Sequence, residues 1–325
     1  MVTKLGRGRC GAHLSLIFTV EDDSERLENQ GSLGAGICVE DGVEVVARGE
    51  DGSGNLNVNF LEREGDSGLY EDVLRELCLA IPDLNEFDWE LNVKLELPTS
   101  QGFGMSASGA IAAAISFQRA IGSPHEESLR RSFLIAHLVE RMRSSGLGDT
   151  TALAAGGVER RLSAGSPYSG PLLDNGPGES EGWSVGTPIL ICWNERTGTH
   201  TSNYIDDSEW KGKICDAGRK EMSSLGKGEW GPKRWLDLIE CSNSFARDSG
   251  LKNDAKRSEI LNRVEDIISS LPEREEFSAL LCMLGESVTI VPKNFENNGD
   301  FFKVLAPLLE SSGLTAIISR VGFAS

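Results

Sequence analysis

The chain has 325 residues, which suggests two domains or two lobes around one core at roughly 100–200 residues per domain. Hydrophobic residues make up 39% and charged residues 25%, a globular composition that excludes a disordered chain or a collagen-like repeat. The 32 Lys and Arg against 50 Asp and Glu give a net charge of −18, so the surface repels nucleic acid and anionic membranes, and neither is expected as a partner. A polyanionic substrate would need local dipoles or a metal ion to hold it.

No apolar run approaches the roughly 20 residues that span a bilayer, and no apolar block follows the N-terminus, so we expect neither a membrane span nor a signal peptide. The seven cysteines are scattered, without a CxxC pair or zinc spacing, and the four histidines form no cluster. Buried, reduced thiols in a cytoplasmic protein are the expected state.

The first third of the chain predicts short strands joined by turns. Residues 31–39 predict a glycine-rich turn followed by a strand. The Asp-Gly pair at 41–42 is typical of a hairpin turn, and residues 43–47 predict the return strand. Apolar residues at helical spacing predict a helix over 69–80. Strict alternation over 89–97 predicts a strand with one buried face.

The middle of the chain predicts a loop at 99–105 and a helix that begins at Ser106 and ends at Gly122, and its small residues favour close packing. The next helix is predicted to begin with Ser123 as its N-cap, Pro124 at the first helical position and Glu126 completing a capping box, and it should run to about residue 144. A tight turn at 146–149 and a short helix at 150–155 follow.

Residues 165–186 are rich in Gly, Pro and Ser and are the best candidate for a boundary, which predicts an N-terminal lobe over 1–165 and a C-terminal lobe over 166–325. The rest predicts strands at 187–193, 287–291 and 315–323, and helices at 209–225, 232–249, 254–270 and 300–311. This order favours an α+β fold over strict βαβ alternation.

One motif is misleading. Residues 6–11 satisfy G-x-G-x-x-G, but a dinucleotide-binding fingerprint must follow a strand and open a helix. Only five residues precede it, and a β-like sequence follows, so a dinucleotide site is not expected. The P-loop pattern G-x-x-x-x-G-K-[ST] is absent from the sequence.

The strongest signal is the glycine-rich segment 98–109, between a strand and a helix. Glycines let the backbone approach a phosphate, and a helix N-terminus supplies N–H groups and partial positive charge. Ser106 places a hydroxyl where it could contact a phosphate oxygen or a metal. A tight turn with an ordinary serine cap is the alternative, and the residues alone leave both open.

Two carboxylates form the second signal. On a helical wheel Glu140 shares the sector of Leu129, Phe133 and Ala136, and a carboxylate in an apolar sector needs a partner such as a metal. Asp149 follows two glycines that leave it accessible. Phosphoryl transfer uses one carboxylate for Mg²⁺ and another near the acceptor hydroxyl. Taken singly, Glu140 also fits a glutamate on the surface, and Asp149 also fits an aspartate in a turn.

Together these motifs resemble the GHMP kinase superfamily, whose phosphate loop reads Pro-x-x-x-Gly-Leu-Gly-Ser-Ser-Ala. The match begins at Pro98, with Phe103 in place of Leu and Met105 in place of the first Ser. Phe-Gly-Met-Ser in this loop resembles the archaeal pantoate kinases within the superfamily, and the resemblance covers about residues 11–325. Further segments support it: 31–36, 146–149, 156–161, 165–167 and 283–288. The usual Pro-Gly near residues 11–15 is altered, and the C-terminal glycine-rich motif is degenerate.

The resemblance implies a two-lobe GHMP kinase fold with an S5-like α/β lobe and a ferredoxin-like α+β lobe. It implies an ATP- and Mg²⁺-dependent kinase that phosphorylates pantoate to 4-phosphopantoate on a route to coenzyme A. Homodimers are common in this family and are the default expectation.

The resemblance also assigns roles to individual residues. Ser106 and Glu140 would hold Mg²⁺, and Asp149 would orient or deprotonate the acceptor hydroxyl. Arg161 is the candidate partner of an acceptor carboxylate, because a guanidinium fork matches it geometrically. The ATP-binding candidates are Pro98, Gly102, Phe103, Gly104, Met105, Ser106, Ala107 and Ser108. The acceptor candidates are His13, Ser15, Ser32, Gly34 and Arg161.

Simpler roles compete with several of these assignments. His13 also fits a half-buried strand histidine, and Arg161 also fits a solvated strand residue. Ser32 and Ser108 also fit a turn and a helix cap.

Two alternative functions stay open. The first is a GHMP kinase acting on another small acceptor, such as homoserine, mevalonate or shikimate. The second is a non-catalytic GHMP-fold sensor that binds nucleotide without turnover. Intact Ser106, Glu140 and Asp149 disfavour the sensor, which has no need of all three.

Overall fold

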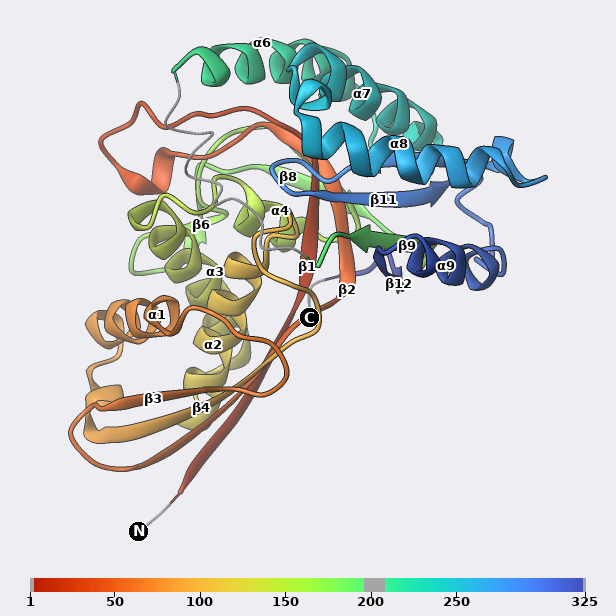
Figure 1. Ribbon diagram of the computed structural model, residues 1–325. Coiled ribbons are helices and arrows are strands. Elements are labelled where there is room, and N and C mark those ends of the chain that lie inside the picture. The colour runs from red at the N-terminus through yellow and green to blue at the C-terminus, as the bar shows by residue number, and fades with distance from the viewer. Residues whose placement is uncertain (1–2, 196–207, 324–325) are drawn as a thin grey trace.

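Two β-sheets with helices packed on them organise the chain in the computed structural model, which describes residues 3–195 and 208–323 (Figure 1). The larger sheet has six strands in the order β3-β4-β2-β5-β8, with β1 paired to β2. Its strands are β1 (Lys4–Phe18), β2 (Gly34–Asp51), β3 (Leu56–Phe60), β4 (Phe87–Leu95), β5 (Val158–Arg161) and β8 (Ser180–Trp183). Only the β3–β4 pair of this sheet is parallel.

The smaller sheet has four antiparallel strands in the order β10-β11-β9-β12. They are β9 (Pro188–Trp193), β10 (Phe277–Leu281), β11 (Ser287–Pro292) and β12 (Thr315–Arg320). A two-stranded ribbon, β6 (Tyr168–Ser169) with β7 (Asp174–Asn175), lies outside both sheets.

The helices fall into two groups along the chain (Figure 1). The first group is α1 (Ser67–Ala80), α2 (Met105–Ala120), α3 (His125–Met142) and α4 (Asp149–Ala155). The second is α6 (Ser208–Leu225), α7 (Trp235–Asp248), α8 (Ala255–Ser269) and α9 (Phe302–Ser311). Short 3₁₀ turns lie at Leu27–Asn29, Pro82–Glu86, Pro232–Arg234, Leu251–Asn253 and Arg274–Glu276. Helices segregated onto mainly antiparallel sheets make an α+β fold, as the sequence predicts. No helix in the described ranges is both long and apolar enough to cross a bilayer.

Helix α2 packs directly on β1, as its small residues predict. A Cβ atom on Gly6 would lie 2.0 Å from the carbonyl oxygen of Ser116, and one on Gly8 would lie 1.9 Å from that of Ala112. These glycines belong to the G-x-G-x-x-G segment, which runs within β1 and opens no helix. The segment therefore serves close helix–sheet packing and is not a dinucleotide fingerprint, as expected.

The predicted hairpin at residues 41–42 is wrong. Strand β2 runs without a turn from Gly34 to Asp51, and β1 is also long, so the first third does not consist of short strands. The register between β1 and β2 shifts between Gly11 and Ala12, and a Cβ on Gly42 would lie 2.2 Å from the carbonyl oxygen of Cys10. Gly42 therefore permits a bulge in a close strand pair, where the sequence suggested a turn.

Other predicted elements mostly agree with the structure. The helices at 69–80, 209–225 and 254–270 are confirmed to within two residues. Helix α3 begins at His125, and no side-chain hydrogen bond caps it, so the predicted cap at Ser123 is wrong. The sequence pattern predicts none of the strands β6, β7, β8 and β10.

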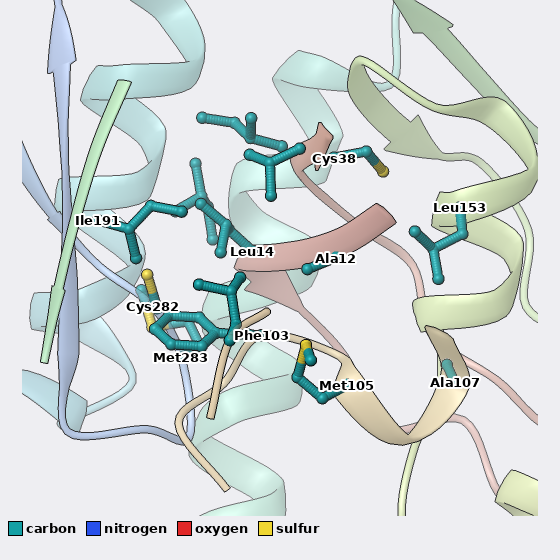
Figure 2. Packing of buried hydrophobic residues seen from close by; sticks show 14 of the residues in the cluster. Ala12, Leu14, Cys38, Phe103, Met105, Ala107, Leu153, Ile191, Cys282 and Met283 are labelled. Atoms are coloured by element: carbon teal, nitrogen blue, oxygen red, sulfur yellow. The ribbon is translucent and has the colours of Figure 1, made fainter. Parts of the chain in front are cut away.

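Residues from both sheets share one hydrophobic core. Figure 2 shows Leu14 of β1 beside Ile191 of β9, with Phe103 and Met283 next to them. Strand β8 follows the predicted boundary at residues 165/166, yet it pairs with β5 in the larger sheet. The division into lobes at that point stays a prediction.

Candidate active site

A cavity of about 530 Å³ opens where the predicted phosphate loop meets the turn before α4. Its wall includes most of the residues that the sequence singles out. They are Ser15, Ser32, Gly102, Phe103, Gly104, Met105, Ser106, Asp149 and Arg161. Residues 143–148 complete one wall, and Met283 and Leu284 contribute from the smaller sheet's side.

The phosphate loop is anchored by its two unusual residues. Phe103 and Met105 are buried, and the Phe103 ring packs edge-on against Trp193 with centroids 5.9 Å apart. Figure 2 shows both side chains pointing into the hydrophobic cluster. Gly102 and Gly104 adopt left-handed conformations, at φ 78° and 58°, which favour glycine. The loop therefore offers chiefly its backbone and Ser106 to a phosphate.

The C-terminal half of the chain holds this loop in place. The amide of Gln101 donates to the Asn194 carbonyl at 3.1 Å, and its Oε1 accepts from the Glu286 backbone N–H at 3.1 Å. The Ser287 hydroxyl donates to the Gln101 carbonyl at 2.5 Å. The Met283 backbone N–H donates to the Ser15 carbonyl at 2.9 Å. These bonds fix the loop relative to β1.

Glu140, Ser106 and Ser145 form what we call the serine side of the site. Glu140 is buried, and its Oε2 and Oε1 accept from the Ser106 hydroxyl at 3.1 Å and the Ser145 hydroxyl at 2.7 Å. Within the described residues Glu140 forms no ion pair. Burial, together with the nearby Asp149 charge, raises its pKa to about 7. A Cβ on Gly146 would lie 2.0 Å from Glu140 Oε2, so this turn needs glycine.

The ligand atoms of the serine side suit Mg²⁺. A buried carboxylate without a cationic partner, beside a hydroxyl, offers the hard oxygen ligands that Mg²⁺ takes. No cluster of three or more His, Cys, Asp or Glu suited to a metal occurs in residues 3–195 and 208–323. Nucleotide phosphates and water would therefore have to supply the remaining ligands.

Asp149, His13, Glu159 and Arg161 form what we call the acceptor side. Asp149 Oδ1 lies 2.6 Å from His13 Nδ1, and the Asp149 side chain remains 20% exposed. Burial alone would raise the pKa of Asp149, but the hydrogen bond and charge of His13, with the Arg161 charge, outweigh burial and lower it. Asp149 is thus an ionised carboxylate at the cavity wall.

His13 lies behind Asp149, away from the cavity. Its Nε2 is 3.0 Å from Glu159 Oε1, and both side chains are fully buried. Burial alone would lower the pKa of His13, but the hydrogen bonds and charges of the two carboxylates raise it overall. A Cβ on Gly36 would lie 2.5 Å from His13 Nε2, so glycine there makes room for the ring.

Arg161 reaches the cavity from β5 across the sheet. It is 1% exposed, its Nη2 donates to the Ile17 carbonyl at 2.9 Å, and it lies 3.8 Å from Glu159 Oε1. Its Nε has no hydrogen-bond partner in the part of the chain that the structure describes. A Cβ on Gly34 would lie 2.3 Å from Nη2, so Gly34 provides the space for this guanidinium.

Several candidates do not line the cavity. Ser108 is fully buried and donates to the Gly11 carbonyl at 2.6 Å, which favours the structural role over a phosphate contact. Ser32 does line it, although its hydroxyl also donates to the Leu33 carbonyl at 2.8 Å. The others outside the wall are Pro98, Ala107, His13, Gly34 and Glu140. Any direct ligand contact by them stays a prediction.

The sequence missed two residues of the site. Ser145 gave no signal beyond its place between the Glu140 helix and Asp149. Glu159 had one available signal, because it is a charged residue in a short segment that follows two glycines and forms a fully buried strand. Its partner lies 146 residues away, which no local pattern reveals.

Comparisons with known proteins show which family and which solved structures the chain resembles. Residues 69–157 match the family described as GHMP kinases N terminal domain. The pantoate kinase of Thermococcus kodakarensis is 31% identical over 266 residues, 80% of each chain. The pantoate kinase of Methanospirillum hungatei is 32% identical over 316 residues, 95% of each chain. A solved structure described as a phosphotransferase related to the CoA biosynthesis pathway has a TM-score of 0.75 at 24% identity, covering 98% of this chain and 96% of its own.

Proposed function

Because this chain belongs to the GHMP kinase superfamily and, within it, to the archaeal pantoate kinases, we propose that it transfers the terminal phosphate of ATP to pantoate. The product is 4-phosphopantoate, on a route to coenzyme A. One observation of the site carries the proposal. The cavity that holds the phosphate loop also holds an ionised carboxylate, Asp149, and a buried guanidinium, Arg161.

The phosphate loop and the serine side suit the nucleotide. Backbone N–H groups between Gly102 and Ser106 would hold the β- and γ-phosphates at the start of α2. Ser106 and Glu140 would hold Mg²⁺, which neutralises developing phosphate charge when bound. Proteins of this superfamily use ATP and Mg²⁺, and we assign both to this chain on that basis and on the fit of Glu140.

The acceptor side suits a hydroxy acid. Arg161 would hold the carboxylate of pantoate, because it lines the cavity and its Nε has no hydrogen-bond partner among the described residues. Asp149 would accept a hydrogen bond from the reacting hydroxyl, orient it, and take its proton as the oxygen bonds to phosphorus. Gly104 brings the phosphate loop close to this carboxylate, since a Cβ there would lie 3.2 Å from Asp149 Oδ1.

The family assignment favours pantoate over homoserine, mevalonate or shikimate, and favours a kinase over a sensor. A homodimer, a cytoplasmic location and the individual roles of the site residues remain predictions. They rest on the resemblance and the geometry.

An assay of ADP release across pantoate, homoserine, mevalonate and shikimate tests the proposal. We expect turnover with pantoate to exceed turnover with each other acid by at least about tenfold, the factor that 1.4 kcal/mol of discrimination supplies. Faster turnover with another acid would reassign the substrate. Nucleotide binding without ADP formation from any acid would favour the sensor.

A further inference from the structure

His13 bridges two carboxylates that come from distant parts of the chain. Its Nδ1 lies 2.6 Å from Asp149 at the start of α4, and its Nε2 lies 3.0 Å from Glu159 in β5. His13 and Glu159 are completely buried, whereas Asp149 reaches the cavity. The three side chains therefore form a line from the interior of the sheet to the reacting end of the site.

The hydrogen bonding of the ring fixes its charge. Ionised carboxylates only accept hydrogen bonds, and a neutral imidazole has a single N–H to donate. His13 satisfies both carboxylates only as an imidazolium that donates from both nitrogens. This agrees with the raised pKa of His13.

The groups around the ring support this charge state. Arg161 of β5 lies 3.8 Å from the same Glu159 oxygen, so two cations face two carboxylates. The Cys38 thiol from β2 lies near Glu159, Arg161 and Asp149, and the Cys10 thiol from β1 lies near Cys38. Burial raises the pKa of both thiols, to about 12 for Cys10, so both stay neutral. The buried cluster is thus balanced in charge.

We propose that His13 and Glu159 are positioning residues: Glu159 holds His13, and His13 fixes Oδ1 of Asp149, which leaves Oδ2 as the oxygen available to the acceptor hydroxyl. The inference rests on the proposed function and deepens it. The resemblance predicts that His13 contacts the acceptor. In this proposal His13 instead holds Asp149 from the side away from the cavity.

His13 gains and loses no proton in the reaction. The hydroxyl proton moves to Oδ2 of Asp149, and the hydroxyl oxygen bonds to the γ-phosphorus. The bond from that phosphorus to the bridging oxygen breaks, and ADP leaves with its electron pair. The imidazolium keeps both protons throughout and holds the carboxylate plane in place.

The main test replaces Glu159 by Gln and uses E181Q as the matched control. Glu181 of β8 pairs at 3.1 Å with Arg160 of β5, the strand that carries Glu159, and it lies outside the cavity. We expect E159Q to lower kcat about tenfold to a hundredfold, as misplacement of a reacting group does, with the KM for ATP unchanged. E181Q should retain wild-type kcat.

The pH profile of kcat/KM gives a readout that a merely structural role would not move. Without the Glu159 charge, His13 deprotonates at lower pH, so the basic limb of the E159Q profile should fall at lower pH by about one unit. The profiles are measured at saturating Mg²⁺, so that protonation of Glu140, whose pKa is about 7, does not set the acidic limb. In H13Q the cation is absent at every pH, so the pKa of Asp149 rises and the acidic limb should move to higher pH instead.

The ring charge is measurable without substrate. The ¹⁵N NMR signals of His13, identified by their absence in H13Q, should be those of an imidazolium at pH 7 in the wild type. A neutral ring in the wild-type protein would overturn the proposal, even if E159Q fails to fold. So would an E159Q enzyme with normal kcat and unmoved limbs, or one in which only the pantoate KM changes. Wild-type protein that is inactive with pantoate but carries the imidazolium would contradict the proposed function alone.

Discussion

The serine side and the acceptor side of the cavity hold their carboxylates in opposite ways. Glu140 accepts from two neutral hydroxyls and has no ion-pair partner among the described residues, and its pKa rises to about 7. Asp149 accepts from a cationic ring, and its pKa falls below the ordinary range. Burial acts to raise the pKa of both carboxyl groups, so the difference comes from their partners.

This contrast suggests that the two carboxylates have different roles. A buried carboxylate without a cation gains most from binding one, which suits a metal ligand. A carboxylate that is paired with His13 is fixed in place and stays ionised over a wide pH range, which suits orientation of a hydroxyl. Substitutions at four residues test this contrast.

Replacing Asp149 by Ala should have the largest effect. We expect kcat to fall by ~10²-fold or more, because a general base or orienting group contributes about 10²–10⁴. Nucleotide affinity should change little, since the phosphate loop and the serine side remain. Single-turnover kinetics with an ATP titration separate the two quantities. A folded D149A enzyme with near-normal turnover would remove Asp149 from the mechanism.

Replacing Arg161 by Ala should raise the KM for pantoate about tenfold to a hundredfold, because a charge-assisted hydrogen bond contributes about 1.5–3 kcal/mol. The KM for ATP should barely move. R161K should recover only part of the loss, since an ammonium cannot form the fork. Thermal unfolding of each variant controls for the lost bond to the Ile17 carbonyl. An unchanged pantoate KM in R161A would assign the carboxylate to another group.

Replacing Glu140 by Gln should raise the Mg²⁺ concentration at half-maximal rate by roughly tenfold, because the amide loses the charge that a hard cation prefers. A pKa of about 7 also means that protons compete with Mg²⁺ in the wild type. The Mg²⁺ requirement should therefore increase as pH falls from 8 to 6, and this pH dependence should weaken in E140Q. Saturation at the wild-type concentration would make Glu140 a structural residue.

Replacing Ser145 by Ala should have the smallest effect. The hydroxyl donates to Glu140 Oε1 at 2.7 Å and helps to keep that carboxylate ionised. Its loss removes one hydrogen bond, worth about 1.5–3 kcal/mol when the acceptor is charged, and bound water can replace part of it. We expect a rise of a few-fold in the Mg²⁺ requirement with kcat unchanged. A fall in kcat equal to that of D149A would erase the contrast between the two sides.

The sequence predicted the serine side better than the acceptor side. Ser106 and Glu140 lie at a helix start and on a helix face, where local spacing reports position directly. His13 and Glu159 meet through strand pairings across the sheet, and the glycines that admit them, Gly36 among them, read locally as turn residues. The same limit explains the wrong hairpin at residues 41–42, because only the pairing with β1 shows that β2 continues.

Phosphorus NMR of a reaction mixture with pantoate, ATP and Mg²⁺ tests whether the chain phosphorylates the terminal hydroxyl of pantoate. We expect one new phosphomonoester signal, with an intensity equal to the amount of ADP formed, split by the two methylene protons beside the terminal hydroxyl. A signal split by a single proton would place the phosphate on the secondary hydroxyl. That result, or inorganic phosphate as the sole new species, would contradict the proposed phosphorylation of pantoate to 4-phosphopantoate.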